Sequence, residues 1–466
     1  NSTITPTLTA NNTYAIYRVL EGAGDLTIVS SGGDAEGSTW AYNNGTITTI
    51  NSPANILNTA IQTKLASADL TIEANKITFS ANITGSTANN LKFLSKTHII
   101  QTVATTISTT GGDVLLSSNV DDATDGESAV NGALRFVYGL SITTSGGDIT
   151  LGSNLSTTGS VKAVKVLATN QIINSASSTL TTQGGDILLS ADRDATGAGN
   201  IYLAFTFNAT SNGGDITFAG GDDNGSGFAY GFGTLYEEGI DIRGALNVQS
   251  GGGDIFFRGK SDIGVATGDG IYGVGFWDAT TNKTINSGSG TIYIEGYSYG
   301  SDTTNDFNYG VTIEGATVTI TSANASTNAI VIKGFNYSGG PTGSQTLDGR
   351  GIDIRATTTK IYATGGGSIL MQAHGYYGYT LYGAIELLAN AGSIELSNVV
   401  DGDATDFYLN GSLWLGSKAS TSVTTSSANV ILKGDDYSFN GYTPDVGTTG
   451  MFKLEPAAAS AFFDQA

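Results

Sequence analysis

The stretch QGGDILLS at residues 183–190 recurs in altered form along the whole chain. A Thr- or Ser-rich segment is followed by a Gly-Gly-Asp turn and then by a short apolar run. Twelve such positions span residues 25–429, a mean spacing of about 37 residues, which lies in the range of solenoid repeats. They are Asp25, Asp69, Asp113, Asp148, Asp186, Asp215, Asp254, Thr291, Asn328, Ser368, Ser393 and Asn429.

Each repeat reads as three short strands separated by three corners, which predicts one coil of a parallel β-helix. We therefore predict an all-β solenoid of about twelve coils, roughly 60 Å long at ~4.8 Å per coil. Glycine at the corner permits positive φ, and the aspartate is expected to close the corner by bonding its own backbone. These aspartates are interpreted as structural and not as catalytic.

Composition excludes several classes of protein. With 20 Lys and Arg against 41 Asp and Glu, the net charge is −21, so a nucleic-acid partner is not expected. The absence of cysteine excludes a disulfide framework and thiolate metal sites. No apolar run is long enough for a membrane-spanning helix, and we expect no membrane insertion.

Three regions are predicted. Residues 1–24 form an N-terminal strand segment or cap, residues 25–450 the β-helix, and residues 451–466 a tail or joint. One segment, NSPANILNTAIQTKLAS at 51–67, breaks the strand pattern. Its apolar spacing predicts a short helix over 53–66, with Ser52 as the cap and Pro53 in the first turn.

The serial Gly-Gly-Asp phrase, together with TWAYNNGTITTINSPANILNTAIQTKLASADLTIEANKITFSANI at residues 39–83, resembles the large bacterial exoproteins of the filamentous-haemagglutinin type. The resemblance covers nearly the whole chain. It implies a right-handed parallel β-helix, secretion, and an adhesive or fibrous role at the bacterial cell surface. The secretion domain of that family is not found as a distinct unit.

Acidic loops follow several of the repeat strands and offer oxygen ligands of the kind that Ca²⁺ prefers. The candidate calcium ligands are Asp121, Asp122 and Asp125 in one loop and Asp401, Asp403 and Asp406 in another. No loop completes the EF-hand pattern. Two interpretations stay open, calcium binding in at least one loop and solvated acidic turns; no other cofactor is expected.

β-Helices also carry polysaccharide lyases and hydrolases, which need carboxylates grouped on one face. The best candidates are the twin strands GIDIRG, with Asp241 and Arg243, and GIDIRA, with Asp353 and Arg355. Alternation sends Asp and Arg to the same outward side. We interpret them as recurring surface ion pairs about three coils apart, and a carbohydrate-cleaving enzyme is the alternative function.

Aromatic residues gather in the long insertions of the second half, which in a solenoid project from one face. Such rings stack on sugars or anchor protein interfaces, and the sequence does not choose between the two. The alternative to a binding role is that the rings lie flat on the rod and only cover its faces. The predicted contact residues are Tyr230, Tyr236, Trp277, Tyr297, Tyr299, Tyr376, Tyr377 and Tyr379.

A solenoid has two open ends, and neither terminus carries an evident polar cap. The ends are therefore expected to meet further copies of the chain, as in a homopolymer, or neighbouring segments of a larger exoprotein. The sequence predicts an extracellular structural or adhesive protein that forms or decorates a surface fibre. Carbohydrate or a host or cell-surface protein is the expected target of the aromatic loops.

Overall fold

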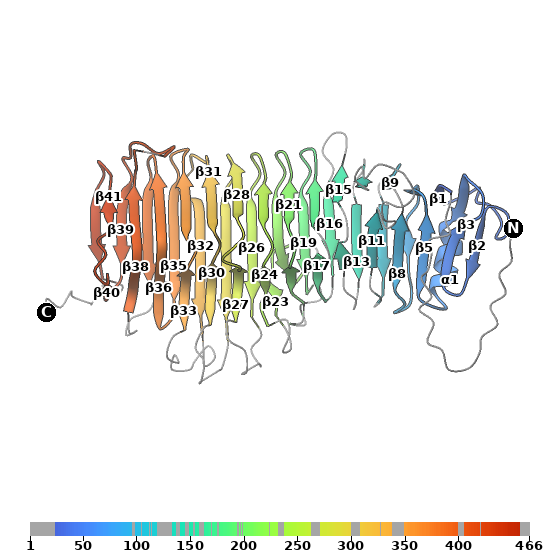
Figure 1. Cartoon of the computed structure of the whole chain (residues 1–466), viewed down its shortest axis with the longest axis horizontal. Helices are drawn as coiled ribbons and strands as arrows, with labels where there is room; N and C mark the ends of the chain where they lie inside the picture. The colour runs from blue at the N-terminus through green and yellow to red at the C-terminus, as the bar shows by residue number, and fades with distance from the viewer. Residues whose placement is uncertain are drawn as a thin grey trace.

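A computed structural model gives the fold of the chain. It describes residues 24–456 except for 96–97, 104, 111, 113, 119–132, 137–139, 145–148, 152–153, 158–162, 169, 175–176, 193–194, 196, 198, 223, 232–236, 262–270, 300–307, 327, 338–348, 399–404 and 420. The chain winds into a rod whose strands follow one another along its long axis, from blue at one end to red at the other (Figure 1).

The predicted parallel β-helix is confirmed. Strands stack in parallel register as two sheets, A and B, and each coil gives two strands to sheet A and one to sheet B. Thirteen such coils are present in the described part of the chain, about 60 Å of stacked strands.

The first strand of each coil lies in sheet A. In chain order these strands are β5 (Leu70–Ala74), β8 (Leu91–Ser95), β11 (Val114–Ser118), β14 (Ile149–Leu151), β17 (Ile172–Asn174), β20 (Ile201–Leu203), β24 (Ile240–Ile242), β27 (Tyr272–Phe276), β30 (Tyr309–Ile313), β33 (Arg350–Ile354), the beginnings of β36 (Tyr377–Ala389) and β38 (Thr405–Gly416), and β40 (Tyr437–Ser438).

The second strand of each coil also lies in sheet A. These strands are β6 (Ile77–Phe79), β9 (His98–Gln101), β12 (Ala133–Phe136), β15 (Asn154–Thr157), β18 (Ser178–Thr181), β21 (Phe207–Thr210), β25 (Leu246–Gln249), β28 (Lys283–Gly288), β31 (Thr317–Ser322), β34 (Thr358–Ala363), the ends of β36 and β38, and β41 (Asp445–Val446).

The third strand of each coil forms sheet B. These strands are β7 (Ile83–Thr84), β10 (Thr105–Thr109), β13 (Leu140–Thr144), β16 (Val164–Leu167), β19 (Ile187–Ala191), β22 (Ile216–Gly220), β26 (Ile255–Lys260), β29 (Ile292–Ser298), β32 (Asn328–Asn336), β35 (Ser368–His374), β37 (Ser393–Asn398), β39 (Asn429–Lys433) and β42 (Phe452–Glu455). A short strand, β23 (Ala229–Tyr230), also pairs with β26.

The apolar core follows from strand alternation. The isoleucine after the Gly-Gly-Asp turn of β19 stacks on the equivalent residue of each following coil as far as β39, and every member of this ladder up to β39 is buried. The members are Ile187, Ile216, Ile255, Ile292, Ile330, Ile369, Ile394 and Val430. Because this position always faces inward, the recurring phrase is a core signal as well as a turn signal.

The corner before sheet B shows what the phrase builds. Gly184 has a φ of 91°, which confirms the predicted left-handed corner. The second glycine allows close approach of coils, because a Cβ on Gly214 would lie 2.4 Å from the carbonyl oxygen of Gly185. The corner is closed by a hydroxyl, as in Ser287, whose Oγ donates to the carbonyl oxygen of Gly290 at 2.6 Å.

The aspartates join coils instead of closing their own corner, so that detail of the prediction is wrong. The N–H of Asp215 donates to Asp186 Oδ1 at 2.9 Å, and the N–H of Asp254 donates to Asp215 Oδ1 at 2.7 Å. Burial raises the pKa of Asp215, and the neighbouring carboxylates raise it further, against the hydrogen bond from Asp254. The N–H groups of Gly184 and Ile187 in the same corner donate to carbonyl oxygens of the next coil, and the Asp186 carboxylate in turn accepts an N–H from that coil.

The phrase does not mark the same corner throughout. The stretches at Asp69, Asp113 and Asp148 lead into β5, β11 and β14 of sheet A, whereas Asp186 and its successors lead into sheet B. The twelve copies therefore do not all stack on one another. The same Gly-Gly-Asp turn can be placed at any corner between two strands of the coil. Repeat spacing alone therefore did not reveal that the strand after the phrase changes from sheet A to sheet B.

The N-terminal end is closed. β1 (Leu26–Val29) lies between β4 (Ala54–Leu57) and β6, while β2 (Trp40–Asn43) and β3 (Thr46–Thr49) form an antiparallel hairpin on β5. Helix α1 (Asn58–Leu65) lies against β7 and buries Ile61 and Leu65 fully. The expectation that both ends are open is therefore wrong for this end.

The helix is shorter than predicted. Residues 54–57 form β4 instead of its first turns, because Ala54 and Ile56 alternate into the core beside β1. Leu57 precedes α1 without a side-chain cap, so Ser52 is not the predicted cap. Within the described residues, no helix has the length and apolarity that crossing a membrane requires.

Candidate functional site

The strands of sheet B lengthen in the middle of the rod. β19 and β22 have five residues each, whereas β29 has seven and β32 has nine. The extension is possible because glycines of neighbouring strands pack backbone against backbone. A Cβ on Gly296 would lie 1.9 Å from the carbonyl oxygen of Gly310, and one on Gly334 would lie 2.2 Å from that of Gly351. Strands β29 and β32 therefore continue past the point where these glycine backbones are in contact.

Aromatic side chains occupy the outward positions of these extensions. Tyr297 pairs with Phe335, which pairs with His374 in the next coil. We call Tyr297, Tyr299, Phe335, Tyr337 and His374 the aromatic platform; all five side chains are half-buried.

Stacking holds the platform together. The ring centroids of Tyr297 and Phe335 are 5.0 Å apart, those of Tyr299 and Tyr337 are 5.7 Å apart, and those of Tyr337 and His374 are 4.5 Å apart. The first two pairs lie nearly parallel, with interplanar angles of 20° and 21°. Because neighbouring rings cover each other's faces, the platform presents mainly ring edges and hydroxyl groups.

Charged groups border the platform. Lys260 Nζ lies 4.2 Å from the ring centroid of Phe228 and 5.3 Å from that of Tyr297. Tyr297 donates its hydroxyl to Glu295 Oε1 at 2.9 Å, and burial together with Glu295 raises the pKa of this phenol. Burial lowers the pKa of His374, whose Nδ1 lies 2.9 Å from the carbonyl oxygen of Asn336. The histidine is therefore neutral at pH 7 and is a member of the stack.

The predicted contact residues are divided by the structure. Tyr297 and Tyr299 belong to the platform. Tyr230, Trp277, Tyr376 and Tyr377 are half-buried elsewhere, and Tyr236 lies outside the described residues. Tyr379 is fully buried and donates to the carbonyl oxygen of Met371 at 2.7 Å, so its prediction as a contact residue is wrong. It sits at an inward position of β36, where alternation decides over aromatic character.

The prediction missed Phe335, Tyr337 and His374 as members of one surface. A sequence signal exists, because Gly296-Tyr297-Ser298-Tyr299 and Gly334-Phe335-Asn336-Tyr337 repeat one pattern of glycine, ring, small residue, ring. His374 follows Ala373, which replaces the glycine of that ladder. The shared register appears only when the coils are stacked.

The outward face of sheet A carries the two Asp–Arg pairs. Arg243 Nε lies 2.7 Å from Asp241 Oδ2, and the Tyr272 hydroxyl donates to Asp241 Oδ1 at 2.8 Å. The Asp241 side chain is only 1% exposed. The tyrosine ring covers the carboxylate by lying over Gly275, where a Cβ would be 2.0 Å from the ring. The pair forms as predicted, but its placement at the surface is wrong.

Asp353 is held still more closely. Its side chain has no exposed surface, and its oxygens lie 3.0 Å from Arg350 Nη1 and 2.7 Å from Arg355 Nε. The Thr380 hydroxyl also donates to this carboxylate. The register places Asp353 three coils from Asp241, as expected. Two arginines, not one, pair with it, because Arg350 at the start of the same strand also reaches the carboxylate.

Lys283 is a further buried charge, which the sequence pattern did not predict. It takes a core position between Leu246 and Val318 and has no exposed surface. Its ammonium donates to the carbonyl oxygen of Gly244 at 2.7 Å. Burial lowers the pKa of Lys283 to about 8. The lysine therefore donates hydrogen bonds to the corner carbonyl oxygens of Arg243 and Gly244.

Glu238 precedes β24 beside these groups. Burial raises its pKa to about 7, and the charge of Asp241 adds to the rise. The folded protein therefore keeps a proton on Glu238 up to about pH 7, whereas the unfolded chain releases it near its ordinary value of 4.5. The native state binds more protons between these values, so this group makes stability fall as pH rises from about 4.5 to 7.

Replacing Glu238 by glutamine is expected to remove this loss. Relative to the parent protein, the Glu238→Gln variant should gain roughly 2 kcal/mol of unfolding free energy between pH 5 and pH 8, at about 1.4 kcal/mol per pKa unit. Urea unfolding at both pH values measures the gain. Parallel pH profiles of the two proteins would contradict a carboxyl group that stays protonated in the folded state up to about pH 7.

The calcium candidates lie mostly outside the described residues, namely Asp121, Asp122, Asp125, Asp401 and Asp403. Asp406 is 3% exposed, and its carboxylate accepts hydrogen bonds from the Asn398 amide and from the N–H groups of Asp435 and Asp436. In the part of the chain that the structure describes, no three His, Cys, Asp or Glu side chains are grouped to hold a metal ion. Calcium binding in these loops stays a prediction.

Comparisons of the chain with protein-family models, with curated proteins and with solved structures find no match. The parallel β-helix therefore stands on the strand register itself.

Proposed function

We propose that this chain is an extracellular structural protein that forms or decorates a bacterial surface fibre and attaches through its aromatic platform. Three features support the proposal. The rod is a continuous parallel solenoid, its net charge of −21 disfavours nucleic acid, and its repeats resemble those of haemagglutinin-type exoproteins. The target is a carbohydrate or a protein at a cell surface or in its matrix.

The platform carries the proposal because Tyr297, Phe335 and His374 sit on strands, and the other two rings directly follow strands. Tyr297 and Phe335 are members of the sheet B ladder, so backbone hydrogen bonds position them before any ligand arrives. Tyrosine offers a large contact area at a low cost in conformational entropy. A rigid group of tyrosine edges beside Lys260 is thus suited to contact with a polar surface.

Removing two rings is expected to weaken attachment. We expect the intact protein to bind at least one member of a panel of immobilised polysaccharides and extracellular-matrix proteins, read by surface plasmon resonance. The double variant Tyr299→Ala/Tyr337→Ala should bind that member at least ~10-fold more weakly, since interface rings commonly carry more than about 1.4 kcal/mol each.

Phe205→Ala is the matched control, because its ring is 49% exposed at the turn between β20 and β21, away from the platform. It should bind like the parent protein. Equal binding by the double variant, or no binding of the parent to any member, would contradict the proposal.

A carbohydrate-cleaving β-helix is the competing function, and one observation favours it. Glu238 keeps a proton near neutral pH beside Asp241, as a general acid does. Against this, Asp241 and Asp353 are buried and paired with arginines. Release of reducing ends from the same polysaccharides, lost in Glu238→Gln, would replace our proposal with the enzyme.

A further inference from the structure

Among the described residues, the core of the rod is uncovered at its C-terminal end. β42 continues the inward ladders of sheet B, with Phe452 on Val430 and Leu454 on Leu432. Val430 and Leu432 are buried, yet Phe452 is 46% exposed and Leu454 is 43% exposed. Of the eight large hydrophobic side chains that are exposed among the described residues, five lie between residues 442 and 454. The last coil thus has core positions without a further coil over them.

The two ends are therefore unlike. At the N-terminal end α1 and the β2–β3 hairpin cover the first coil, and Gln62 of α1 donates to the carbonyl oxygen of Thr84 at 3.0 Å. At the other end β42 is the edge strand of sheet B. An edge strand over an open core binds another strand readily. A partner that itself has such an end satisfies both edges at once, whereas among the described residues α1 lies against β7, the first strand of sheet B, at the N-terminal end.

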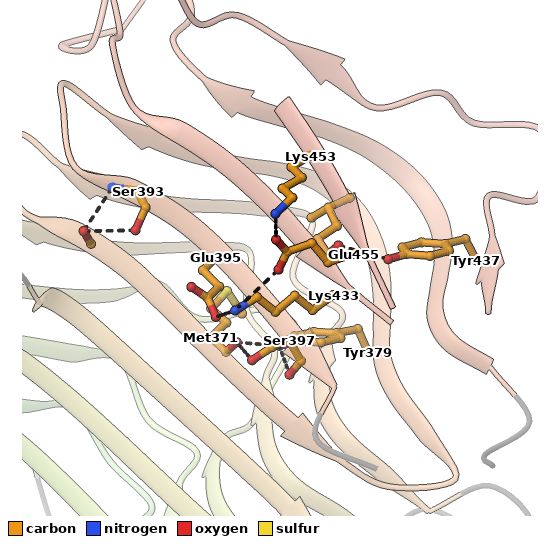
Figure 2. A network of polar contacts seen from close by, with 11 residues as sticks. Met371, Tyr379, Ser393, Glu395, Ser397, Lys433, Tyr437, Lys453 and Glu455 are labelled. Atoms are coloured by element: carbon orange, nitrogen blue, oxygen red, sulfur yellow. Dashed lines mark hydrogen bonds and ion pairs between the residues drawn. The ribbon is translucent and has the colours of Figure 1, made fainter. Parts of the chain in front are cut away.

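The charges of β42 favour a second copy of the same end. Lys453 and Glu455 are on its outward face, and Figure 2 shows Lys453 reaching Glu455 while Lys433 lies between Glu455 and Glu395. In an antiparallel pair with a twofold axis at Leu454, Lys453 of one copy faces Glu455 of the other, and the reverse. Leu454 then faces Leu454. The sequence Lys-Leu-Glu at residues 453–455 is thus complementary to itself in this register.

We propose that two copies of this chain associate tail to tail through their C-terminal coils. The twofold interface covers the open cores with each other, and β42 pairs with β42 of the second copy. This association uses one end of each chain and closes, as isologous interfaces do. It names a partner for the open end and does not depend on the aromatic platform or its target.

The mass of the intact chain in solution tests the proposal, by sedimentation equilibrium across micromolar concentrations. We expect a species of twice 47.7 kDa. Leu454→Asp sets two carboxylates against each other at the axis and should weaken association at least ~100-fold, to a monomer, because facing like charges are costly in an interface. Lys453→Glu should weaken it at least ~10-fold, and Lys453→Glu/Glu455→Lys should restore it.

Ile50→Asp is the matched control, because Ile50 is 49% exposed at the opposite end. It should leave the dimer intact, and circular dichroism should show that every variant is folded. A monomer at all concentrations would mean that another part of the same chain covers the core, and would overturn the proposal. So would an open series of larger species, which indicates head-to-tail stacking, or an unchanged dimer in Leu454→Asp.

Discussion

Replacing Asp353 by alanine is expected to destabilise the protein by about 3–5 kcal/mol, because a buried ion pair that loses one partner leaves an uncompensated charge. Asp353 has no exposed surface, and Arg350 beside it is only 9% exposed. Arg355 and Thr380 contact the same carboxylate. The loss is measured as a shift of the urea midpoint and of the melting temperature.

An exposed ion pair provides the control for Asp353→Ala. Lys64 Nζ lies 3.0 Å from Glu36 Oε2, and the Glu36 side chain is 43% exposed. Glu36→Ala should therefore cost less than about 1 kcal/mol. Asp353→Asn, which keeps the shape of the side chain, should fall between the two. If Asp353→Ala costs no more than Glu36→Ala, the buried network does not stabilise the rod.

The second large effect is expected at the glycines behind the platform. Gly296→Ala places a Cβ 1.9 Å from the carbonyl oxygen of Gly310. Backbone atoms cannot turn away as a side chain does, so the two strands must separate. We expect a loss at or above the upper end of the 1–3 kcal/mol typical of overpacking, about 3 kcal/mol or more. Thermal unfolding followed by circular dichroism measures it.

Gly441→Ala is the matched control for this site. Gly441 has a φ of 81° and no atom within 4 Å of a Cβ placed on it. The alanine there meets backbone strain without a clash, which costs about 1 kcal/mol. Tyr297 and Phe335 flank the affected corner, so Gly296→Ala should also perturb tyrosine fluorescence. Similar melting temperatures for the two variants would show that the strands part easily at Gly296.

Much of the architecture was predictable from local pattern. The Gly-Gly turn, the inward isoleucine and the spacing of about 37 residues lead to a coil of three strands, because turn chemistry and alternation act over a few residues. The identity of each corner was not predictable. Asp148 and Asp186 begin the same phrase, yet the strands after them lie in different sheets.

The candidate sites divide in the same way. The Asp241–Arg243 pair and its distance of three coils from Asp353 followed from sequence, since both depend on alternation and repeat length. The burial of these carboxylates did not follow, because Tyr272 reaches Asp241 from the next coil. Likewise, aromatic content did not distinguish the buried Tyr379 from the half-buried Tyr297.

The sequence by itself determined that this protein is an all-β parallel solenoid with acidic character and aromatic residues concentrated in its second half. Only the tertiary structure decided which rings share a surface, which charges are buried and which end is closed. The physical reason is that turns and alternation are local properties of the chain. Stacking, burial and end exposure arise between residues about 20–50 positions apart, whose register is set only when one coil lies on another.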